Sequence, residues 1–228
     1  MGESITFHEG DVSGSGYLAL PASGAGPAVI VIQEWWGLVG HIKDVVDRFA
    51  AAGFVALAPD LYHGQAAAEP DTAKKLMMEM QMQEASRDIS AAAHYLLSRP
   101  ETISTSVGAV GFCMGGSLAI WSSTIIDSIN ASVGFYPGGS WERMAPNWEN
   151  YAGKFAMIHC AESDGTSSAP GIQEAVSAIT SAHGSVETFD YPGTKHAFFN
   201  DDRPEVYDNA AADLTWDRTL GFFREHVK

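Results

Sequence analysis

Short apolar runs alternate with segments of helical periodicity along almost the whole chain. Residues 28–33 form a nearly continuous β-branched run, which is typical of a strand buried on both faces. Residues 41–52 follow with apolar side chains at helical spacing, and Gly53 ends this segment as a helix C-cap does. Residues 54–58 predict the next strand, which Pro59 stops. The alternation predicts an α/β fold with a mostly parallel sheet and helices on both of its faces.

The same pattern continues to the end of the chain. Further strands are predicted at residues 107–112, 131–136, 155–160 and 186–191, and helices at residues 72–98, 115–123, 172–182 and 205–226. Near the start, residues 4–8 and 17–22 predict an antiparallel hairpin at one edge of the sheet. With no linker or repeat, residues 1–228 are expected to form a single domain.

The charge balance excludes several classes of partner. Against 28 Asp and Glu residues there are only 13 Lys and Arg residues, which gives a net charge of −15. Such a surface repels phosphate backbones and anionic lipids, so neither nucleic acid nor membrane is an expected partner. No run of about 18 apolar residues predicts a membrane span. Residues 1–6 have neither a basic start nor an apolar core, so we expect no signal peptide and a cytoplasmic location.

One cysteine lies where catalysis is expected in such a sheet, just beyond the end of a strand. Gly111-Phe112-Cys113-Met114-Gly115 joins a predicted strand to a predicted helix and has the form of a nucleophile elbow. That turn would expose the sulfur of Cys113 and aim the amide of Met114 at a developing oxyanion, while the helix N-terminus favours the thiolate. The motif alone is equally compatible with a buried structural cysteine.

Two other strand ends carry the groups that a nucleophile needs. Asp164 follows the strand that ends at Cys160, and His196 follows the strand that ends at Tyr191. Each is an ordinary loop residue when taken alone. The chain order Cys113, Asp164, His196 is that of nucleophile, acid and base in α/β-hydrolases, and it predicts a catalytic triad.

The first parallel strand leads into Gln33-Glu34-Trp35-Trp36. We expect the Trp35 amide to be the second oxyanion donor beside that of Met114. Glu34 is unusual there, because a carboxylate would repel the oxyanion, and the residues alone favour a surface acid at the start of a loop. The histidines show no metal-ligand spacing and the glycines no dinucleotide-loop context, so neither a metal nor an organic cofactor is predicted.

Together these segments resemble the dienelactone hydrolase family. The resemblance covers almost the whole chain and is carried by Gln33-Glu34, Ala58-Pro-Asp-Leu-Tyr62, Gly111-Phe-Cys-Met-Gly-Gly116, Gly134-Phe-Tyr-Pro-Gly138, Asp164 and His196-Ala-Phe-Phe-Asn-Asp201. It implies an α/β-hydrolase fold, a Cys113–His196–Asp164 triad and an oxyanion hole formed by the Trp35 and Met114 amides. It also implies that Glu34 keeps the resting Cys113 protonated, and that the substrate is a small-molecule ester or lactone cleaved without a cofactor.

The sequence departs from that family at its substrate-binding arginines. The family's namesake binds its substrate's carboxylate with arginines, one of them four residues after the catalytic histidine, where this chain has Asn200. No arginine lies between Arg48 and Arg87, where the other is expected; Lys74 or Lys75 would be a partial substitute, as a point charge rather than a fork. The nearby methionines 77, 78, 80 and 82 predict core packing or an adaptable pocket wall.

The residues therefore predict a hydrolase acting through a thioester, on activated esters and enol-lactones rather than peptides. A glutaminase also uses Gly-x-Cys-x-Gly, but it normally has a glutamate two residues after its histidine, where this chain has Phe198. A non-catalytic or redox-sensing protein on a hydrolase scaffold is the other alternative, with a Cys113 that oxidises without turnover. The chain is expected to be a monomer or a small homo-oligomer.

Overall fold

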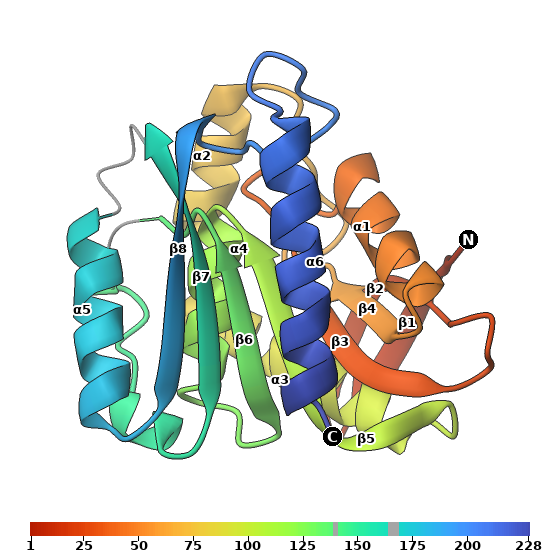
Figure 1. Ribbon diagram of the computed structural model, residues 1–228. Coiled ribbons are helices and arrows are strands. Elements are labelled where there is room, and N and C mark those ends of the chain that lie inside the picture. Colours follow the sequence, from red (N-terminus) through yellow and green to blue (C-terminus); the bar gives the residue numbers. More distant parts are fainter. Residues whose placement is uncertain (139–140, 164–168) are drawn as a thin grey trace.

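The computed structural model describes residues 1–138, 141–163 and 169–228, and its centre is one eight-stranded sheet (Figure 1). The strand order is β1-β2-β4-β3-β5-β6-β7-β8. The strands are β1 (Glu3–Glu9), β2 (Val12–Ala19), β3 (Gly26–Ile32), β4 (Val55–Pro59), β5 (Thr102–Phe112), β6 (Ile129–Phe135), β7 (Phe155–Ser163) and β8 (Ser185–Lys195). β2 pairs antiparallel with β1 and β4, and the other neighbours are parallel. The predicted parallel sheet with an antiparallel edge is confirmed.

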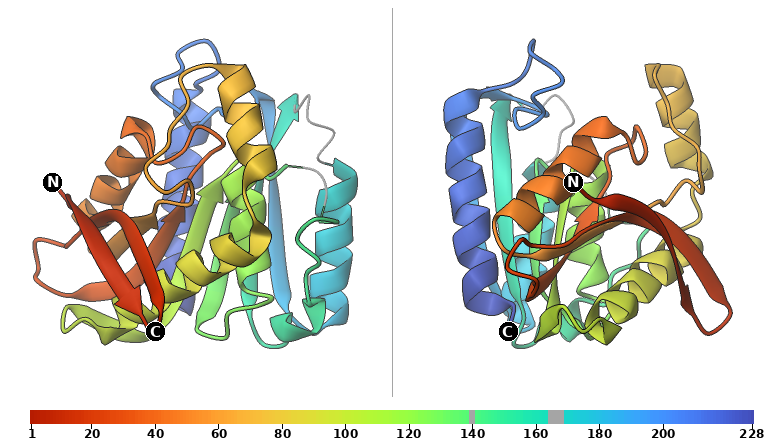
Figure 2. Two further views of the ribbon diagram at one scale, coloured as in Figure 1. Left: turned by 180° about the vertical axis from the view of Figure 1, so that it is seen from behind. Right: turned by 90° about the vertical axis from the view of Figure 1, so that its right-hand side faces the viewer.

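Helices cover both faces of this sheet (Figures 1 and 2). They are α1 (Gly40–Ala51), α2 (Pro70–Glu79), α3 (Met82–Ser98), α4 (Met114–Ser122), α5 (Ala169–Ser181) and α6 (Asn209–His226), with a 3₁₀ turn at Trp148–Tyr151. α1 and α6 pack on one face, and α3, α4 and α5 on the other. None of the helices in the described part of the chain is both long and apolar enough to cross a membrane.

The alternation of side chains along β3 shows why both faces need a cover. Val29 and Val31 belong to the core under α1 and α6, whereas Ile30 and Ile32 belong to the core under α3 and α4. All four side chains are fully buried, and each contributes about 1.5–3 kcal/mol of transfer free energy. The β-branched run thus makes β3 an interior strand, as predicted.

The single long helix predicted after β4 is wrong, because the structure has two helices, α2 and α3. Between them Met80 and Gln81 are extended, with ψ of 124° and 123°. The segment has no helix breaker, and its residues are good helix formers. The break coincides with a tertiary contact: the Arg143 guanidinium donates to the carbonyl oxygens of Met77, Met78 and Met80 at 3.3, 3.3 and 2.9 Å.

The last helix begins later than the predicted residue 205. Asp208 is its N-cap, and the Asp208 side chain accepts a hydrogen bond from the Ala211 amide at 2.9 Å. Residues 205–208 belong instead to the loop that follows His196.

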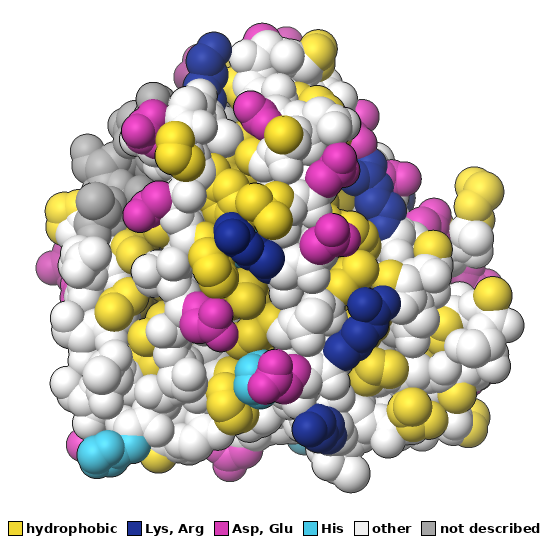
Figure 3. Space-filling view, in the orientation of Figure 1, with side chains coloured by type: hydrophobic (Ala, Val, Ile, Leu, Met, Phe, Trp, Pro, Cys, Tyr) yellow, Lys and Arg dark blue, Asp and Glu magenta, His cyan; other side chains and the backbone are white. Residues whose placement is uncertain are grey.

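Charged side chains are dispersed over the face shown in Figure 3. Acidic side chains are spread over this face, some of them beside Lys, Arg or His, and the Lys and Arg side chains in view do not gather into a patch.

Candidate active site

Cys113 occupies a strained turn between β5 and α4. Its φ is 56° and its ψ is −120°, a conformation that non-glycine residues rarely adopt. Its amide donates to the Phe135 carbonyl of the neighbouring strand at 3.0 Å. A Cβ on Gly111 would lie 1.9 Å from the Gly115 carbonyl oxygen, and one on Gly115 would lie 2.3 Å from that of Gln33. The two glycines are therefore required by close backbone approach, and the strained strand-to-helix turn predicted from the motif is present.

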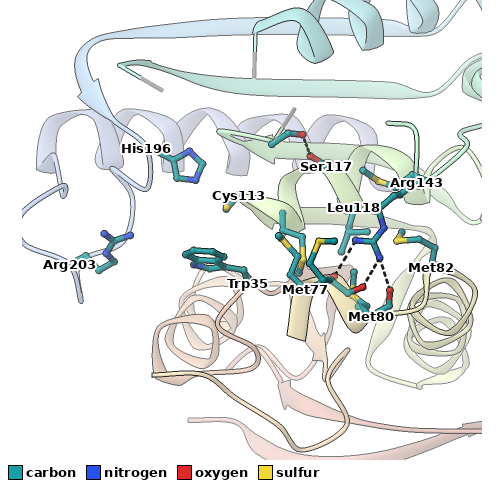
Figure 4. Close-up of a pocket in the computed structure, with 14 residues that line it drawn as sticks. Trp35, Met77, Met80, Met82, Cys113, Ser117, Leu118, Arg143, His196 and Arg203 are labelled. Carbon is teal, nitrogen blue, oxygen red and sulfur yellow. Dashed lines mark hydrogen bonds between the residues drawn. The ribbon is translucent and has the colours of Figure 1, made fainter. Parts of the chain in front are cut away.

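His196 directly follows β8 and lies at the same cavity as Cys113. A cavity of about 500 Å³ is lined by Cys113, His196, Trp35 and Met114 together with residues from several other loops (Figure 4). The His196 ring packs edge-on against Tyr136, with ring centroids 4.9 Å apart. The structure thus brings four of the predicted site residues to one cavity at the carboxyl ends of the strands.

Asp164, the predicted acid of the triad, lies outside the described residues. The described strand leading to it is nevertheless informative, because β7 pairs in parallel with β8 and Ser163 is the register partner of Lys195. Ser163 immediately precedes Asp164, and Lys195 immediately precedes His196. The two adjacent strand ends therefore lead directly into the predicted acid and the predicted base.

The two predicted oxyanion donors are available for hydrogen bonding. Met114 is the first residue of α4, where the amides of a helix have no intrahelical acceptor. Within the described ranges, no acceptor pairs with the amide of either Met114 or Trp35. Both residues line the cavity beside Cys113. A helix N-terminus also carries partial positive charge, which favours an anion at this position.

Glu34 is buried, with 2% of its surface exposed, so the surface position favoured by the residues alone is wrong. Burial is the largest influence on this carboxyl and raises its pKa. An electrostatic interaction with His41 and a hydrogen bond from Asn200 oppose that rise only in part. The raised pKa shifts this carboxyl towards its neutral form, which weakens its repulsion of a nearby oxyanion.

The environment of Glu34 also shows what Asn200 does. The Asn200 Nδ2 donates to Glu34 Oε2 at 3.0 Å, and the Asn200 Oδ1 accepts from the Asp202 amide at 3.1 Å. Glu34 Oε1 has no hydrogen-bond partner among the described residues, so the structure contains no Glu34–Cys113 hydrogen bond there. Where the family's namesake has an arginine for substrate, this chain therefore has a buried amide that supports Glu34.

Two arginines at the cavity were missed by sequence reasoning. Arg143 lies in the loop region after β6, and Arg203 lies in the loop that follows His196. The sequence does contain one signal for these two arginines, because each of them follows the end of a predicted strand, where the site is expected. Lys74 and Lys75 are not among the residues that line the cavity, and Lys75 Nζ lies 3.9 Å from Glu79 Oε1 instead. Neither lysine substitutes for an arginine at this cavity.

The described lining of the cavity provides a nucleophilic thiol, Cys113, and an acid–base group, His196. Among the residues that the structure describes, no three His, Cys, Asp or Glu side chains are grouped as metal ligands. Both cysteines are free thiols.

A mostly parallel eight-stranded sheet, with a nucleophile elbow after a central strand and a histidine after the last strand, defines an α/β-hydrolase-type protein. The family model described as "Dienelactone hydrolase family" matches residues 15–227, and the chain belongs to that family of hydrolases.

Similar proteins agree with this membership. The chain is 37% identical to "Protein usf" of Aquifex pyrophilus and 35% identical to a "Putative carboxymethylenebutenolidase" of Aquifex aeolicus, each over the full length of both chains. Among solved structures, a putative dienelactone hydrolase from Klebsiella pneumoniae superposes with a TM-score of 0.85, covering 98% of each chain at 24% identity. That structural likeness shows the shared fold.

Proposed function

We propose that this protein hydrolyses a small-molecule carboxylic ester or lactone through Cys113, His196 and Asp164. The observation that carries the proposal is that Cys113, held in a strained elbow, and His196, at the end of β8, line the same cavity. The register of β7 with β8 supports Asp164 as the group that orients His196. The name of the Aquifex aeolicus relative, a putative carboxymethylenebutenolidase, supports a lactone or ester as substrate.

The first half of the reaction forms an acyl-enzyme. His196 accepts the proton of the Cys113 thiol, and the thiolate attacks the carbonyl carbon of the substrate. The negative charge moves to the carbonyl oxygen, where the Trp35 and Met114 amides stabilise it. Each donor of this kind contributes on the order of 3 kcal/mol to the transition state.

The second half releases both products. The tetrahedral intermediate collapses to a thioester on Cys113, and the leaving alkoxide takes the proton from His196. His196 then removes a proton from water, which attacks the thioester through a second oxyanion. Expulsion of the thiolate gives the carboxylic acid product, and return of the proton from His196 to the sulfur of Cys113 restores the free enzyme.

Glu34 has a supporting role in this proposal. Its raised pKa weakens the repulsion between its carboxyl and the oxyanion, and Asn200 fixes one of its carboxyl oxygens. The other oxygen, Oε1, is the atom through which it would hold the resting thiol of Cys113. A reducing compartment such as the cytoplasm keeps that thiol in its active form.

Replacement of Cys113 by alanine tests the proposal, with p-nitrophenyl acetate as substrate. Cys113→Ala abolishes hydrolysis, and the matched control Cys160→Ala, at the other cysteine, retains it. Iodoacetamide labels wild-type Cys113 and stops turnover. A Cys113→Ala variant with full activity would refute the assignment, and a wild-type protein that is labelled but has no turnover would favour the redox-sensor alternative.

A further inference from the structure

The cavity beside Cys113 is walled mainly by methionine side chains. Six of them line it: Met77, Met78, Met80, Met82, Met114 and Met144. The first four, which we call the methionine wall, come from the end of α2, the extended break after it and the first residue of α3. Figure 4 shows this wall on the opposite side of Cys113 from Arg203. Methionine is flexible and polarisable, so such a wall adapts to apolar groups of varied shape.

Three of the five guanidinium N–H donors of Arg143 are already bonded to the backbone, so an anion would compete with these bonds for the side chain. Its Nη1 donates to Met77, and its Nη2 donates to Met78 and Met80, all through carbonyl oxygens at 2.9–3.3 Å (Figure 4). These carbonyls lie at the C-terminal end of α2, where a cation is favourable. Arg143 therefore stabilises the methionine wall.

Arg203, the other cationic residue of the cavity lining, is also paired. Its Nε and Nη2 both lie 3.0 Å from Glu205 Oε1, so its charge is matched on its own loop. Asn200, at the position of the family's arginine, is turned to Glu34. A carboxylate on the substrate would have to displace one of these contacts, in a protein whose net charge is −15.

From these observations we propose that the cavity selects uncharged esters or lactones with an apolar group, rather than carboxylate-bearing ones. This inference rests on the proposed function, since it names the substrate class of the same site. The apolar group lies against the methionine wall while the reacting carbonyl lies at Cys113. The cavity of about 500 Å³ suits a medium-sized substrate. At roughly 30 Å³ for each water-sized group, the cavity holds on the order of 15 non-hydrogen atoms, which is about the size of p-nitrophenyl butyrate or hexanoate.

A series of p-nitrophenyl esters tests the apolar preference. Each buried methylene adds roughly two- to fourfold to binding, so the four extra methylenes of the hexanoate raise kcat/KM roughly 16- to 250-fold above that of the acetate. The p-nitrophenyl monoester of adipic acid has the same chain length as the hexanoate but ends in a carboxylate. Its kcat/KM is expected to be at least about tenfold lower, because burial of an unpaired charge is costly.

The double variant Met77→Gln/Met78→Gln assigns the preference to the wall. Both side chains line the cavity but belong to none of the hydrophobic core clusters, and glutamine matches methionine in helix propensity. The variant is expected to reduce kcat/KM for the hexanoate three- to tenfold more than it reduces kcat/KM for the acetate. Leu214→Gln, at an exposed apolar residue of α6, is the control, and it is expected to change kcat/KM for neither the hexanoate nor the acetate.

The outcomes separate this inference from the proposed function. Hydrolysis that depends on Cys113 but does not increase with chain length, or that favours the adipate monoester, overturns the apolar preference and leaves the hydrolase intact. A double variant with unchanged hexanoate kinetics overturns the role of the wall. Hydrolysis of every ester by Cys113→Ala overturns the proposed function itself.

Discussion

Replacement of Gly115 by alanine perturbs the close backbone approach between the start of α4 and the end of β3 at the candidate site. A Cβ there would lie 2.3 Å from the Gln33 carbonyl oxygen and 2.5 Å from that of Ile32, whereas ordinary contact begins near 3.4 Å. The end of β3 must therefore move by about 1 Å, and the loop that carries Trp35 moves with it. Overpacking of this kind costs typically 1–3 kcal/mol, reduced by the gain of up to about 1 kcal/mol from alanine in a helix.

The effect on catalysis is expected to exceed the effect on stability. A displacement of about 1 Å in a positioned group costs on the order of 100-fold in rate, so kcat for p-nitrophenyl acetate falls 10- to 100-fold. Urea unfolding measures the stability, with an expected loss of about 1–2 kcal/mol. Gly221→Ala is the matched control in α6, where an added Cβ meets nothing within 4 Å, and it stabilises by about 0.5–1 kcal/mol. A Gly115→Ala protein with wild-type kcat and stability would refute the close-approach argument.

Three further predictions follow from buried and bridging groups. Burial raises the Glu34 pKa, so the unfolded chain releases this proton at a lower pH than the folded protein does. Wild type therefore loses stability relative to Glu34→Gln as pH rises above the ordinary glutamate value of about 4.3. Urea unfolding at a series of pH values measures this difference in stability, and a difference that does not change with pH contradicts the prediction. Burial lowers the His159 pKa to about 3, so wild type loses stability as pH falls below about 6.5, where the histidine of the unfolded chain gains a proton. In thermal unfolding, the melting temperature of His159→Gln is expected to fall less steeply with decreasing pH than that of wild type. Equal dependence of the two melting temperatures on pH contradicts the prediction. Arg143→Gln removes the bonds to the α2 carbonyls and accelerates amide hydrogen exchange in residues 77–82; unchanged exchange would show that the wall is held by packing alone.

The sheet could be predicted because each of its strands is indicated by residues that are adjacent in the sequence. The β-branched run of β3, Gly53 after α1 and Pro59 at the end of β4 are properties of adjacent residues, and the structure places the strands close to the predicted positions. The nucleophile elbow was predictable for the same reason, because Gly111 and Gly115 flank Cys113 within one motif.

Features created by distant residues could not be predicted. The gap between α2 and α3 accompanies bonds from Arg143, which lies 63 residues beyond Met80, and the helix propensities there indicate no break. The burial of Glu34 depends in part on Asn200, which is 166 residues away. Arg203 reaches the cavity only because the loop after His196 extends to residue 208 before α6 begins.

Acyl-enzyme trapping tests the central claim most directly. The protein is mixed with p-nitrophenyl hexanoate, quenched in acid and analysed by peptide mass spectrometry. We predict one hexanoyl group on the peptide that contains Cys113, absent from the Cys113→Ala variant. An acyl group on another residue, or steady turnover by Cys113→Ala, would contradict the account.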